Sequence, residues 1–153
     1  DGYHIISLHL SPHRYESRQR DIDLILETIR QSGPFEKWII MGDFNSVSPV
    51  DAEKYADGRL VEYLRKAEEK RPQLKNLVNG KIDYSVHQRI LDFGFIDSAR
   101  LDKNFSETSF GTRIDFIYIS PDLRSAFTGG NFIIDDFTRK YSDHRPLYIT
   151  WEK

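Results

Sequence analysis

The pattern of apolar and polar residues predicts β-strands near both ends of the chain. Residues 3–10 alternate with a period of two, so that Ile5, Ser7 and His9 share one face and apolar residues occupy the other. Asp1-Gly2, directly before this strand, is a favoured hairpin turn and therefore predicts a further strand upstream. Other strands are expected at 37–41, 113–120, 131–135 and 146–151, with weaker extended segments at 95–101 and 108–111.

Between these strands the spacing of the apolar residues changes to that of helices. The first helix lies within 14–34 and ends at Gly33-Pro34, and its apolar face consists of Ile22, Ile25, Leu26 and Ile29. Two more helices are predicted within 57–70 and 84–95, the second ended by Gly94. The charged runs at 14–20 and 66–71 are interpreted as solvated faces, and residues 65–81 as a surface excursion.

The order of the predicted elements indicates the fold class, and the composition excludes several kinds of site. The alternation of strands and helices predicts an α/β fold in one domain of 153 residues, with helices covering a mixed sheet. No apolar run approaches the length of a membrane span. The absence of cysteine excludes disulfides, thiolate metal sites and cysteine nucleophiles. The formal net charge of −2 argues mildly against a protein dedicated to duplex DNA.

The segment Gly42-Asp43-Phe44-Asn45 follows a short apolar strand and carries the first candidate chemistry. In extended backbone Asp43 and Asn45 point to the same side, just past the carboxyl end of a buried strand, where α/β sheets place ligands. An acid and an amide there can hold a water molecule or a phosphate oxygen. The alternative is an Asx-turn that caps the strand.

A second candidate is Asp115, which shares one face of its strand with Ile117 and Ile119. A carboxylate among apolar neighbours is costly unless it is paired, so a histidine or arginine from elsewhere in the chain is the expected partner. The alternative is an edge strand with Asp115 in water.

The third candidate pair is Asp143-His144, immediately before the last strand. An acid and an imidazole in one loop suit metal binding or proton transfer, although an ordinary polar turn has the same composition. His9 is a further candidate on its strand, whereas His4, His13 and His87 are interpreted as surface or core residues. No G-x-S-x-G, P-loop, H-E-x-x-H or G-x-G-x-x-G motif is present.

Taken together, "GDFN", "RIDFIYIS" and "SDHRPL", in this order, resemble the endonuclease/exonuclease/phosphatase superfamily with its deoxyribonuclease I-like fold. The strand that ends in "LHLS" resembles the histidine motif of the same family, so the resemblance spans His9 to Trp151. It implies a four-layered sandwich of two mixed sheets with helices outside. It also implies a Mg²⁺- or Mn²⁺-dependent phosphoesterase that uses in-line attack by water.

The resemblance implies a role for each candidate residue. Asp43 would orient or deprotonate the attacking water, and Asn45 would hold the nucleophile and a phosphate oxygen. Asp115 would orient and charge-stabilise His144, which would donate a hydrogen bond to the phosphate; these two side chains are therefore predicted to lie within hydrogen-bond reach. Asp143 would help to hold the metal, and His9 would contact the phosphate or assist the leaving group.

The chain departs from the family pattern at its N-terminal side. The asparagine and the glutamate that serves as main metal ligand in the family have no counterpart in it, and Ser7-Leu8 stand where Asn-Thr is common. Residues 1–153 are therefore interpreted as the C-terminal portion of such a domain, about half of the sandwich, without the N-terminal portion. This portion is expected to be inactive when isolated and to self-associate through its uncovered sheet.

Two classes of function remain open. The first is a phosphoesterase acting on nucleic acid, on a phospholipid or inositol phosphate head group, or on a small phosphoester. The second is a catalytically inactive binding module that retains the fold. The presence of Asp43, Asn45, Asp115, Asp143 and His144 together argues against the second class.

Overall fold

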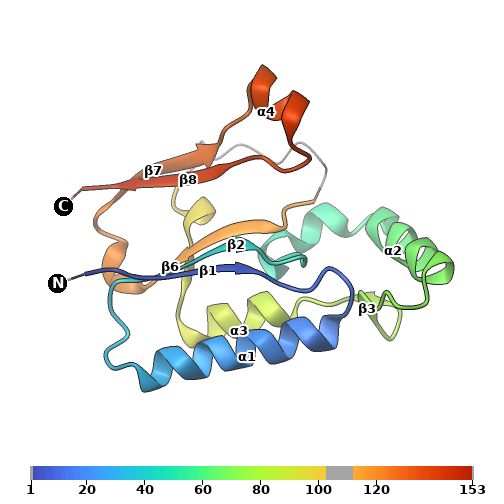
Figure 1. Ribbon diagram of the computed structural model, residues 1–153, viewed down its shortest axis with the longest axis horizontal. Coiled ribbons are helices and arrows are strands. Elements are labelled where there is room, and N and C mark those ends of the chain that lie inside the picture. Colours follow the sequence, from blue (N-terminus) through green and yellow to red (C-terminus); the bar gives the residue numbers. More distant parts are fainter. Residues whose placement is uncertain (1, 103–111, 153) are drawn as a thin grey trace.

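The computed structural model describes residues 2–102 and 112–152, and a four-stranded sheet lies at its centre (Figure 1). The strand order is β1-β2-β6-β5. β1 runs parallel to β2, and the other pairs are antiparallel. The sheet is therefore mixed, as predicted. Its strands are β1 (His4–His9), β2 (Trp38–Asp43), β6 (Asp115–Ile119) and β5 (Ile96–Asp97).

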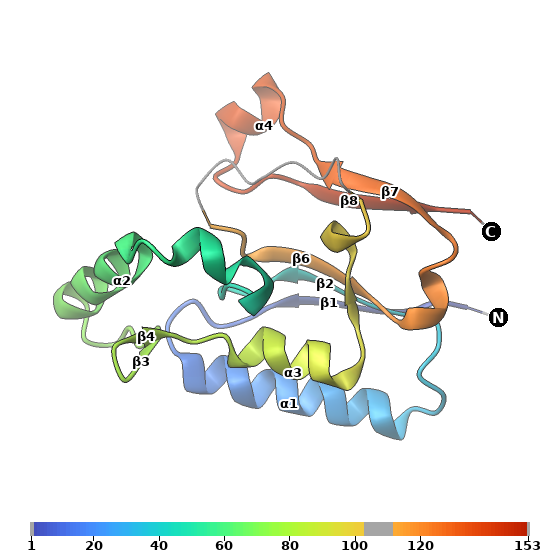
Figure 2. The ribbon, with the colours of Figure 1, turned by 180° about the vertical axis from the view of Figure 1, so that it is seen from behind.

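Two helices, α1 (Tyr15–Gln31) and α3 (Ser85–Phe93), cover one face of this sheet (Figures 1 and 2). α1 buries the apolar stripe predicted for it, since Ile22, Leu26 and Ile29 are all buried. The glycine after α3, Gly94, adopts the left-handed conformation that ends the helix. Each fully buried side chain of this size contributes about 1.5–3 kcal/mol, so this layer holds most of the stabilising apolar burial. The core consists of Leu10, Ile22, Leu26, Ile29, Trp38, Ile40, Phe44, Val86, Ile90, Phe95, Phe116 and Tyr118.

The opposite face of the sheet is covered by a separate two-stranded sheet, β7 (Phe127–Phe132) and β8 (Leu147–Trp151). Figure 1 shows this pair on the other side of β6 from α1 and α3. Ile39, Ile117 and Ile119 are buried beneath it, against partly buried residues that include Leu147 and Ile149. The last two strands therefore form a second layer. Helices, mixed sheet and second sheet confirm the α/β prediction.

The apolar cover on this second side is incomplete above β1. Ile5 shares the face of Ile39 and Ile119 through the strand pairing, yet it is 56% exposed. Tyr3, the residue before β1, packs against Trp151 in a tilted arrangement with ring centroids 5.4 Å apart, and both side chains are exposed. An exposed apolar strip therefore runs along the outer side of β1 next to β8.

The predicted strand at 131–135 lies instead at β7, Phe127–Phe132, and it contains Gly129 and Gly130. Because glycine has a low strand propensity, the sequence pattern placed the start of this strand after the two glycines. Pairing with β8 nevertheless holds these residues in the sheet. Residues 136–141 form a helix that was not predicted, α4 (Asp136–Tyr141). A reciprocal capping box between Asp135 and Thr138 begins it.

The predicted surface excursion at 65–81 is more ordered than expected. α2 (Arg59–Lys70) extends into it, and β3 (Leu77–Val78) pairs with β4 (Lys81–Ile82). Asn79 and Gly80 both have positive φ, 50° and 74°, as a two-residue hairpin turn requires. The extended segment at 95–101 is reduced to β5 and a 3₁₀ turn, Ser98–Arg100. Asp1 and the segment 108–111 lie outside the described residues.

No helix in the described part of the chain is both long enough and apolar enough to span a membrane.

Candidate active site

Three polar side chains occupy matching positions at the ends of neighbouring strands. In the pairing of β1 with β2, His9 lies opposite Asp43, and in the pairing of β2 with β6, Asp43 lies opposite Asp115. Residues paired in this way point to the same face of a sheet. The register therefore places one imidazole and two carboxylates in a row across three strands.

Gly42 makes the close approach of β1 and β2 possible next to this row. Its φ is +135°, and a Cβ atom at this position would lie 2.0 Å from the backbone oxygen of Leu8. Only glycine fits without displacing β1. The glycine of the "GDFN" segment therefore fixes the strand spacing that holds His9 beside Asp43.

Phe44 explains why an aromatic residue separates the acid from the amide. Its side chain is fully buried in the helix-side core and packs edge-on against Phe116. Because Phe44 turns into the core, Asp43 and Asn45 remain on the open side. Burial of the aromatic ring thus anchors the segment and orients its two polar neighbours.

Asn45 reaches that side by a different route from the one predicted. Its φ is 47°, which is left-handed rather than extended backbone. Its backbone N–H donates to Oδ1 of Asp43 at 2.7 Å, so the Asx-turn considered as an alternative is present. Its side-chain Nδ2 also donates to Oδ2 of Asp43 at 3.1 Å and to the backbone oxygen of Leu10 at 2.9 Å. The turn itself brings acid and amide together.

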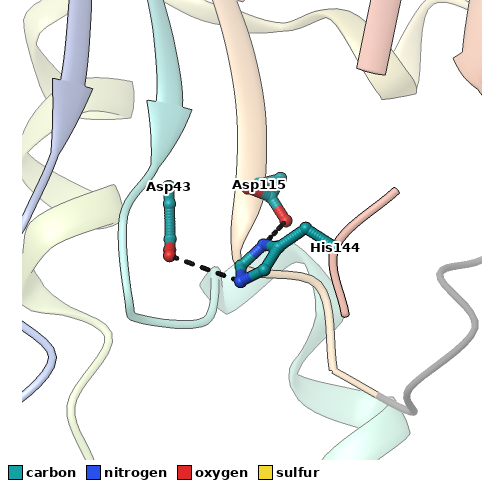
Figure 3. Close-up of side chains that lie close together, drawn as sticks. All are labelled: Asp43, Asp115 and His144. Carbon is teal, nitrogen blue, oxygen red and sulfur yellow. Dashed lines mark hydrogen bonds and ion pairs between the residues drawn. The ribbon is translucent and has the colours of Figure 1, made fainter. Parts of the chain in front are cut away.

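His144 enters the site from the loop before β8 (Figure 3). Its Nδ1 donates to Oδ2 of Asp115 at 2.8 Å, which confirms the predicted hydrogen bond between these two residues. Its other ring nitrogen, Nε2, lies 3.8 Å from Oδ2 of Asp43. The imidazole therefore lies between the two carboxylates, as Figure 3 shows.

The electrostatics of the pair follow from burial and from this hydrogen bond. Burial raises the pKa of Asp115 above its usual value, although the hydrogen bond from His144 acts in the opposite direction. The hydrogen bond to Asp115 is the main cause of a raised pKa at His144, and the charges of Asp115, Asp43 and Asp143 add to it. His144 thus keeps its proton to a higher pH than a free imidazole, with Nε2–H as an available donor.

His9 and Asp143 lie at the margin of this group. Nε2 of His9 lies 3.5 Å from Oδ2 of Asp43, and the His9 side chain is 71% exposed. Asp143 is exposed, and it lies close enough for its charge to affect His144. Among the described residues, the donor atoms close enough together to share a metal ion come from Asp43, Asp115 and His144, within 4.8 Å of one another.

The donor set has the chemistry of a site for a hard divalent cation. Mg²⁺ and Mn²⁺ prefer carboxylate oxygens, and Mg²⁺ usually takes one or two of them and keeps several water molecules. Asp43 and Asp115 supply two such carboxylates, both only partly exposed. The residues that are present therefore fit the ion that the sequence resemblance implies.

A second charged cluster next to the site was missed in the sequence. Arg113 donates two hydrogen bonds to Asp97, at 2.9 and 2.6 Å, and its Nε donates to Asp51 at 2.9 Å. Its guanidinium also lies 4.1 Å from the ring centroid of Phe116. An arginine two residues before Asp115 was the available signal, but its partners lie 62 and 16 residues away along the chain.

The burial of two other side chains, Arg18 and His87, bears on the interpretation of the sequence. Arg18, assigned to a solvated face, is only 2% exposed, so that assignment is wrong for this residue. His87 is a core histidine, fully buried, with Nδ1 2.8 Å from the hydroxyl of Tyr118. Burial lowers the pKa of His87 to about 3, so it is neutral and takes no part in the exposed cluster.

Several solved structures share this fold at low sequence identity. The 3′ phosphatase NExo from Neisseria, bound to a product DNA hairpin, is 19% identical, with a TM-score of 0.65; the match covers 100% of this chain and 62% of that one. An AP endonuclease from Archaeoglobus fulgidus is 16% identical, with a TM-score of 0.64 and 97% and 61% coverage. A conserved protein of unknown function from Enterococcus faecalis is 21% identical, with a TM-score of 0.56 and 97% and 50% coverage.

This chain thus spans between half and two thirds of the length of those structures. A comparison with curated protein sequences found no match. The model of the Endonuclease/Exonuclease/phosphatase family matches residues 2–144, which include every candidate site residue. The chain belongs to the Endonuclease/Exonuclease/phosphatase family.

Proposed function

We propose that the protein is a metal-dependent phosphoesterase that hydrolyses a phosphate ester by in-line attack of water. The observation that carries the proposal is the row of His9, Asp43 and Asp115 with His144 inserted beside it. Phosphoryl transfer requires a positioned nucleophile and donors directed at the developing charge, rather than a covalent partner. The four side chains supply both.

Asp43 is the proposed acceptor for the attacking water. One of its oxygens, Oδ2, already accepts a hydrogen bond from Asn45 and faces His144, so the carboxylate is held in one orientation. A fixed carboxylate can orient a water molecule and take its proton as the bond to phosphorus forms. Asn45 holds Asp43 in place through its side-chain Nδ2, which also donates to the backbone oxygen of Leu10, so its Oδ1 is the group proposed to hold the attacking water.

His144 is the proposed donor to the phosphate. Asp115 binds Nδ1–H, which fixes the ring orientation and leaves Nε2–H directed toward the space next to Asp43. The raised pKa of His144 favours the charged form of this donor, which suits the negative charge that accumulates on the phosphate. Asp115 is a positioning residue in this scheme, and His9 is a second imidazole that can contact the phosphate or assist the leaving group.

Asp43 and Asp115 would hold the Mg²⁺ or Mn²⁺ ion, and Asp143, whose charge acts on His144, is the further residue proposed to help hold it, directly or through water. When bound, the ion would act as a Lewis acid that neutralises charge on the phosphate. We propose that residues 1–153 form the C-terminal portion of the domain. The family's glutamate ligand would then come from the N-terminal portion.

Nucleic acid is the substrate class that we propose first. The support is the fold shared with a 3′ phosphatase solved with a product DNA hairpin and with an AP endonuclease. A net charge of −2 provides no general attraction to a duplex, so a strand end or a single-stranded segment fits better than long duplex DNA. Phospholipid or inositol phosphate head groups and small phosphoesters are the other substrate classes to be compared with nucleic acid.

The alternative of an inactive binding module is not favoured. A module released from catalysis does not need an oriented histidine between two carboxylates, and an incompletely paired carboxylate such as Asp115 is costly to keep.

The test is a panel assay on the protein with its complete catalytic domain. Hydrolysis of a 3′-phosphorylated oligonucleotide, an abasic-site duplex, an inositol phosphate and a generic phosphomonoester is measured with Mg²⁺, with Mn²⁺ and with a chelator. We expect metal-dependent release of phosphate or strand cleavage that is lost in His144→Asn and retained in His4→Asn, an exposed histidine away from the site. Equal rates with metal and with chelator, or an unaffected His144→Asn variant, would contradict the proposal.

The same proposal predicts the behaviour of residues 1–153 alone. The exposed strip of Tyr3, Ile5 and Trp151 lies next to β1, the edge strand of the main sheet, and exposed apolar surface of this kind drives association. We expect the isolated chain to self-associate and to show no Mg²⁺-dependent hydrolysis. Light scattering and the same assay check this; a stable monomer with robust activity would refute it.

A further inference from the structure

A large hollow adjoins the candidate active site on the side of α2. Its volume is about 850 Å³, which is within the range of pockets that bind small ligands. Figure 2 shows α2 and the β3–β4 hairpin beside the start of α1, and the hollow is lined by residues of these elements and of the loop after β2. We call it the α2 hollow; residues that define it include Arg18, Asn45, Tyr63, Leu64, Arg71 and Asn76.

Arg18 lines this hollow as a buried arginine. The residue is 2% exposed, and although the charges of Asp83, Glu16 and Asp43 act on it, no carboxylate in the described part of the chain forms an ion pair with it. Its Nη1 donates to the backbone oxygen of Ser11 at 2.9 Å and to Oδ1 of Asn76 at 3.0 Å, both neutral acceptors. Its buried Nε has no hydrogen-bond partner among the described residues. Burial lowers the pKa of Arg18 and the nearby carboxylates offset this only in part, so an anion bonded to the guanidinium would compensate it further.

The position of Arg18 couples the hollow to the active site. Nδ2 of Asn45 donates to the backbone oxygen of Leu10, and Nη1 of Arg18 donates to that of Ser11, the next residue. Consecutive residues lie about 3.8 Å apart along the chain. The two side chains are therefore held by adjacent peptide groups, and both line the same hollow. A ligand that contacts Asn45 has the guanidinium of Arg18 beside it.

The rest of the lining suits a compact ligand that carries an anionic group. Leu60, Leu64 and Ala67 give one wall an apolar surface, and Tyr63 adds an exposed aromatic ring. Arg71, which is exposed at the end of α2, forms no ion pair with any other described residue. Two carboxylates, Asp57 and Asp83, also line the α2 hollow, but the cationic side chains outnumber them, with Arg18 at its depth and Arg71 at its rim.

We propose that the α2 hollow binds a second phosphate group of the substrate, with Arg18 in its wall and Arg71 at its rim. The inference rests on the proposed function, because it assigns the hollow to the same ligand whose scissile phosphate lies at Asp43 and His144. The shared chemistry is a compact phosphate ester with a further phosphate a short covalent distance away. A nucleotide unit with phosphates on both sides of the sugar has this chemistry, and so does an inositol polyphosphate.

The experiment measures binding, so that it does not depend on turnover. Isothermal titration calorimetry is performed on the protein with its complete catalytic domain, with adenosine 3′,5′-bisphosphate, adenosine 5′-monophosphate, an inositol bisphosphate and an inositol monophosphate. The variants are Arg18→Gln and Arg71→Gln, with Arg65→Gln as control. Arg65 is another exposed arginine of α2, but it does not line the hollow and it pairs with Glu62.

We expect at least one bisphosphate to bind about tenfold or more tightly than its monophosphate, an advantage worth about 1.4 kcal/mol. Arg18→Gln should abolish this advantage, and Arg71→Gln should reduce it. The bisphosphate that shows the larger advantage over its monophosphate indicates whether the ligand is a nucleotide or an inositol phosphate. Because Arg71 is exposed, its variant reports on the hollow even if Arg18→Gln does not fold.

Two results would overturn the inference: equal affinity for bisphosphates and monophosphates, or a bisphosphate advantage that survives both arginine substitutions. Either result leaves the proposed function standing if the panel assay shows metal-dependent hydrolysis. Conversely, an arginine-dependent advantage in a protein that hydrolyses nothing supports the hollow as a phosphate site and contradicts the proposed activity.

Discussion

Two charged clusters flank the start of β6, and they differ in how completely their charges are paired. In the cluster of Arg113 with Asp97 and Asp51, the side chains are only 11%, 1% and 10% exposed, and the guanidinium bonds both carboxylates. In the cluster of Asp43, Asp115 and His144, the imidazole is 41% exposed, and one ring nitrogen lies 3.8 Å from its nearest carboxylate oxygen.

The difference separates a structural ion cluster from a site that can react. The donors of Arg113 are matched to carboxylates, and this outweighs the effect of burial, so that the pKa of Arg113 is raised. In the other cluster Asp115 remains partly uncompensated, with its pKa raised by burial, and Nε2 of His144 lies 3.8 Å from Asp43, beyond hydrogen-bond distance. Carboxylates that are not fully satisfied, beside an accessible donor, are typical of functional sites. The following substitutions test this contrast.

The largest effect is expected for the reactive cluster. Asp43→Ala or His144→Ala should each lower kcat by about 10²–10⁴-fold in the active protein, because each removes a positioned acid–base group. Neither side chain belongs to the apolar core, so both variants should fold, although each loses hydrogen bonds and the midpoint of urea unfolding should fall modestly. A steady-state assay and an unfolding curve are recorded on the same samples. Asp136→Asn, which alters a fully exposed acid on α4, is the control. Near-normal turnover in either alanine variant would remove that residue from the mechanism.

Arg113→Met should show the opposite behaviour. The substitution leaves Asp97 and Asp51 buried without their cation, and breaking a buried pair in this way costs about 3–5 kcal/mol. The free energy of unfolding, from urea titration, is the measurement. Arg65→Met is the control, since its pair with Glu62 is exposed and such pairs contribute about 0–1 kcal/mol. Equal losses for Arg113 and Arg65 would show that the buried cluster has no special structural weight.

Gly42→Ala should affect both properties at once. The new Cβ would lie 2.0 Å from the Leu8 oxygen, and the positive φ alone costs about 1–3 kcal/mol. Separation of β1 from β2 would also break the register that holds His9 opposite Asp43. We expect lower stability together with lower kcat, measured in the same two assays. A variant that loses stability but keeps full activity would show that the site tolerates a shift of β1.

The two histidines should give pH dependences of opposite sign. For His87 the folded pKa of about 3 lies below the unfolded value of 6.5, so stability falls as the pH drops from 6.5 toward 3. The slope is about 1.4 kcal/mol per pH unit. For His144 the folded pKa is raised, so its contribution is present below pH 6.5 and is lost as the pH rises through the folded pKa.

Urea titrations between pH 4 and pH 9 check this pair of predictions. His87→Gln should flatten the acid side of the profile, and His144→Ala should flatten the neutral-to-alkaline side. An acid slope that persists in His87→Gln would assign it to carboxylates instead.

Local sequence was sufficient for the main helices and central strands, although not for α4 or the bounds of β7, and for one contact in the site. The periodicity of α1 predicted the buried stripe of Ile22, Leu26 and Ile29 because an amphipathic helix has one way to bury its apolar face. The hydrogen bond between Asp115 and a residue from elsewhere followed from the cost of burying an unpaired carboxylate. Motif order then identified His144 as the partner.

Tertiary structure alone decided which polar residues are buried and what surrounds them. Arg18 lies in a charged run that looks solvated, but its guanidinium is held by the backbone oxygen of Ser11 and by the side chain of Asn76, both of which lie outside its own helix. Asp51 and Asp97 carry no local sign that they bind Arg113, because their positions depend on how distant segments pack. Likewise, the register of β2 with β6 places Asp43 opposite Asp115, and a shift of one residue would turn one of them to the other face. Periodicity reports the environment of one element, whereas burial and register depend on contacts between elements far apart in the chain.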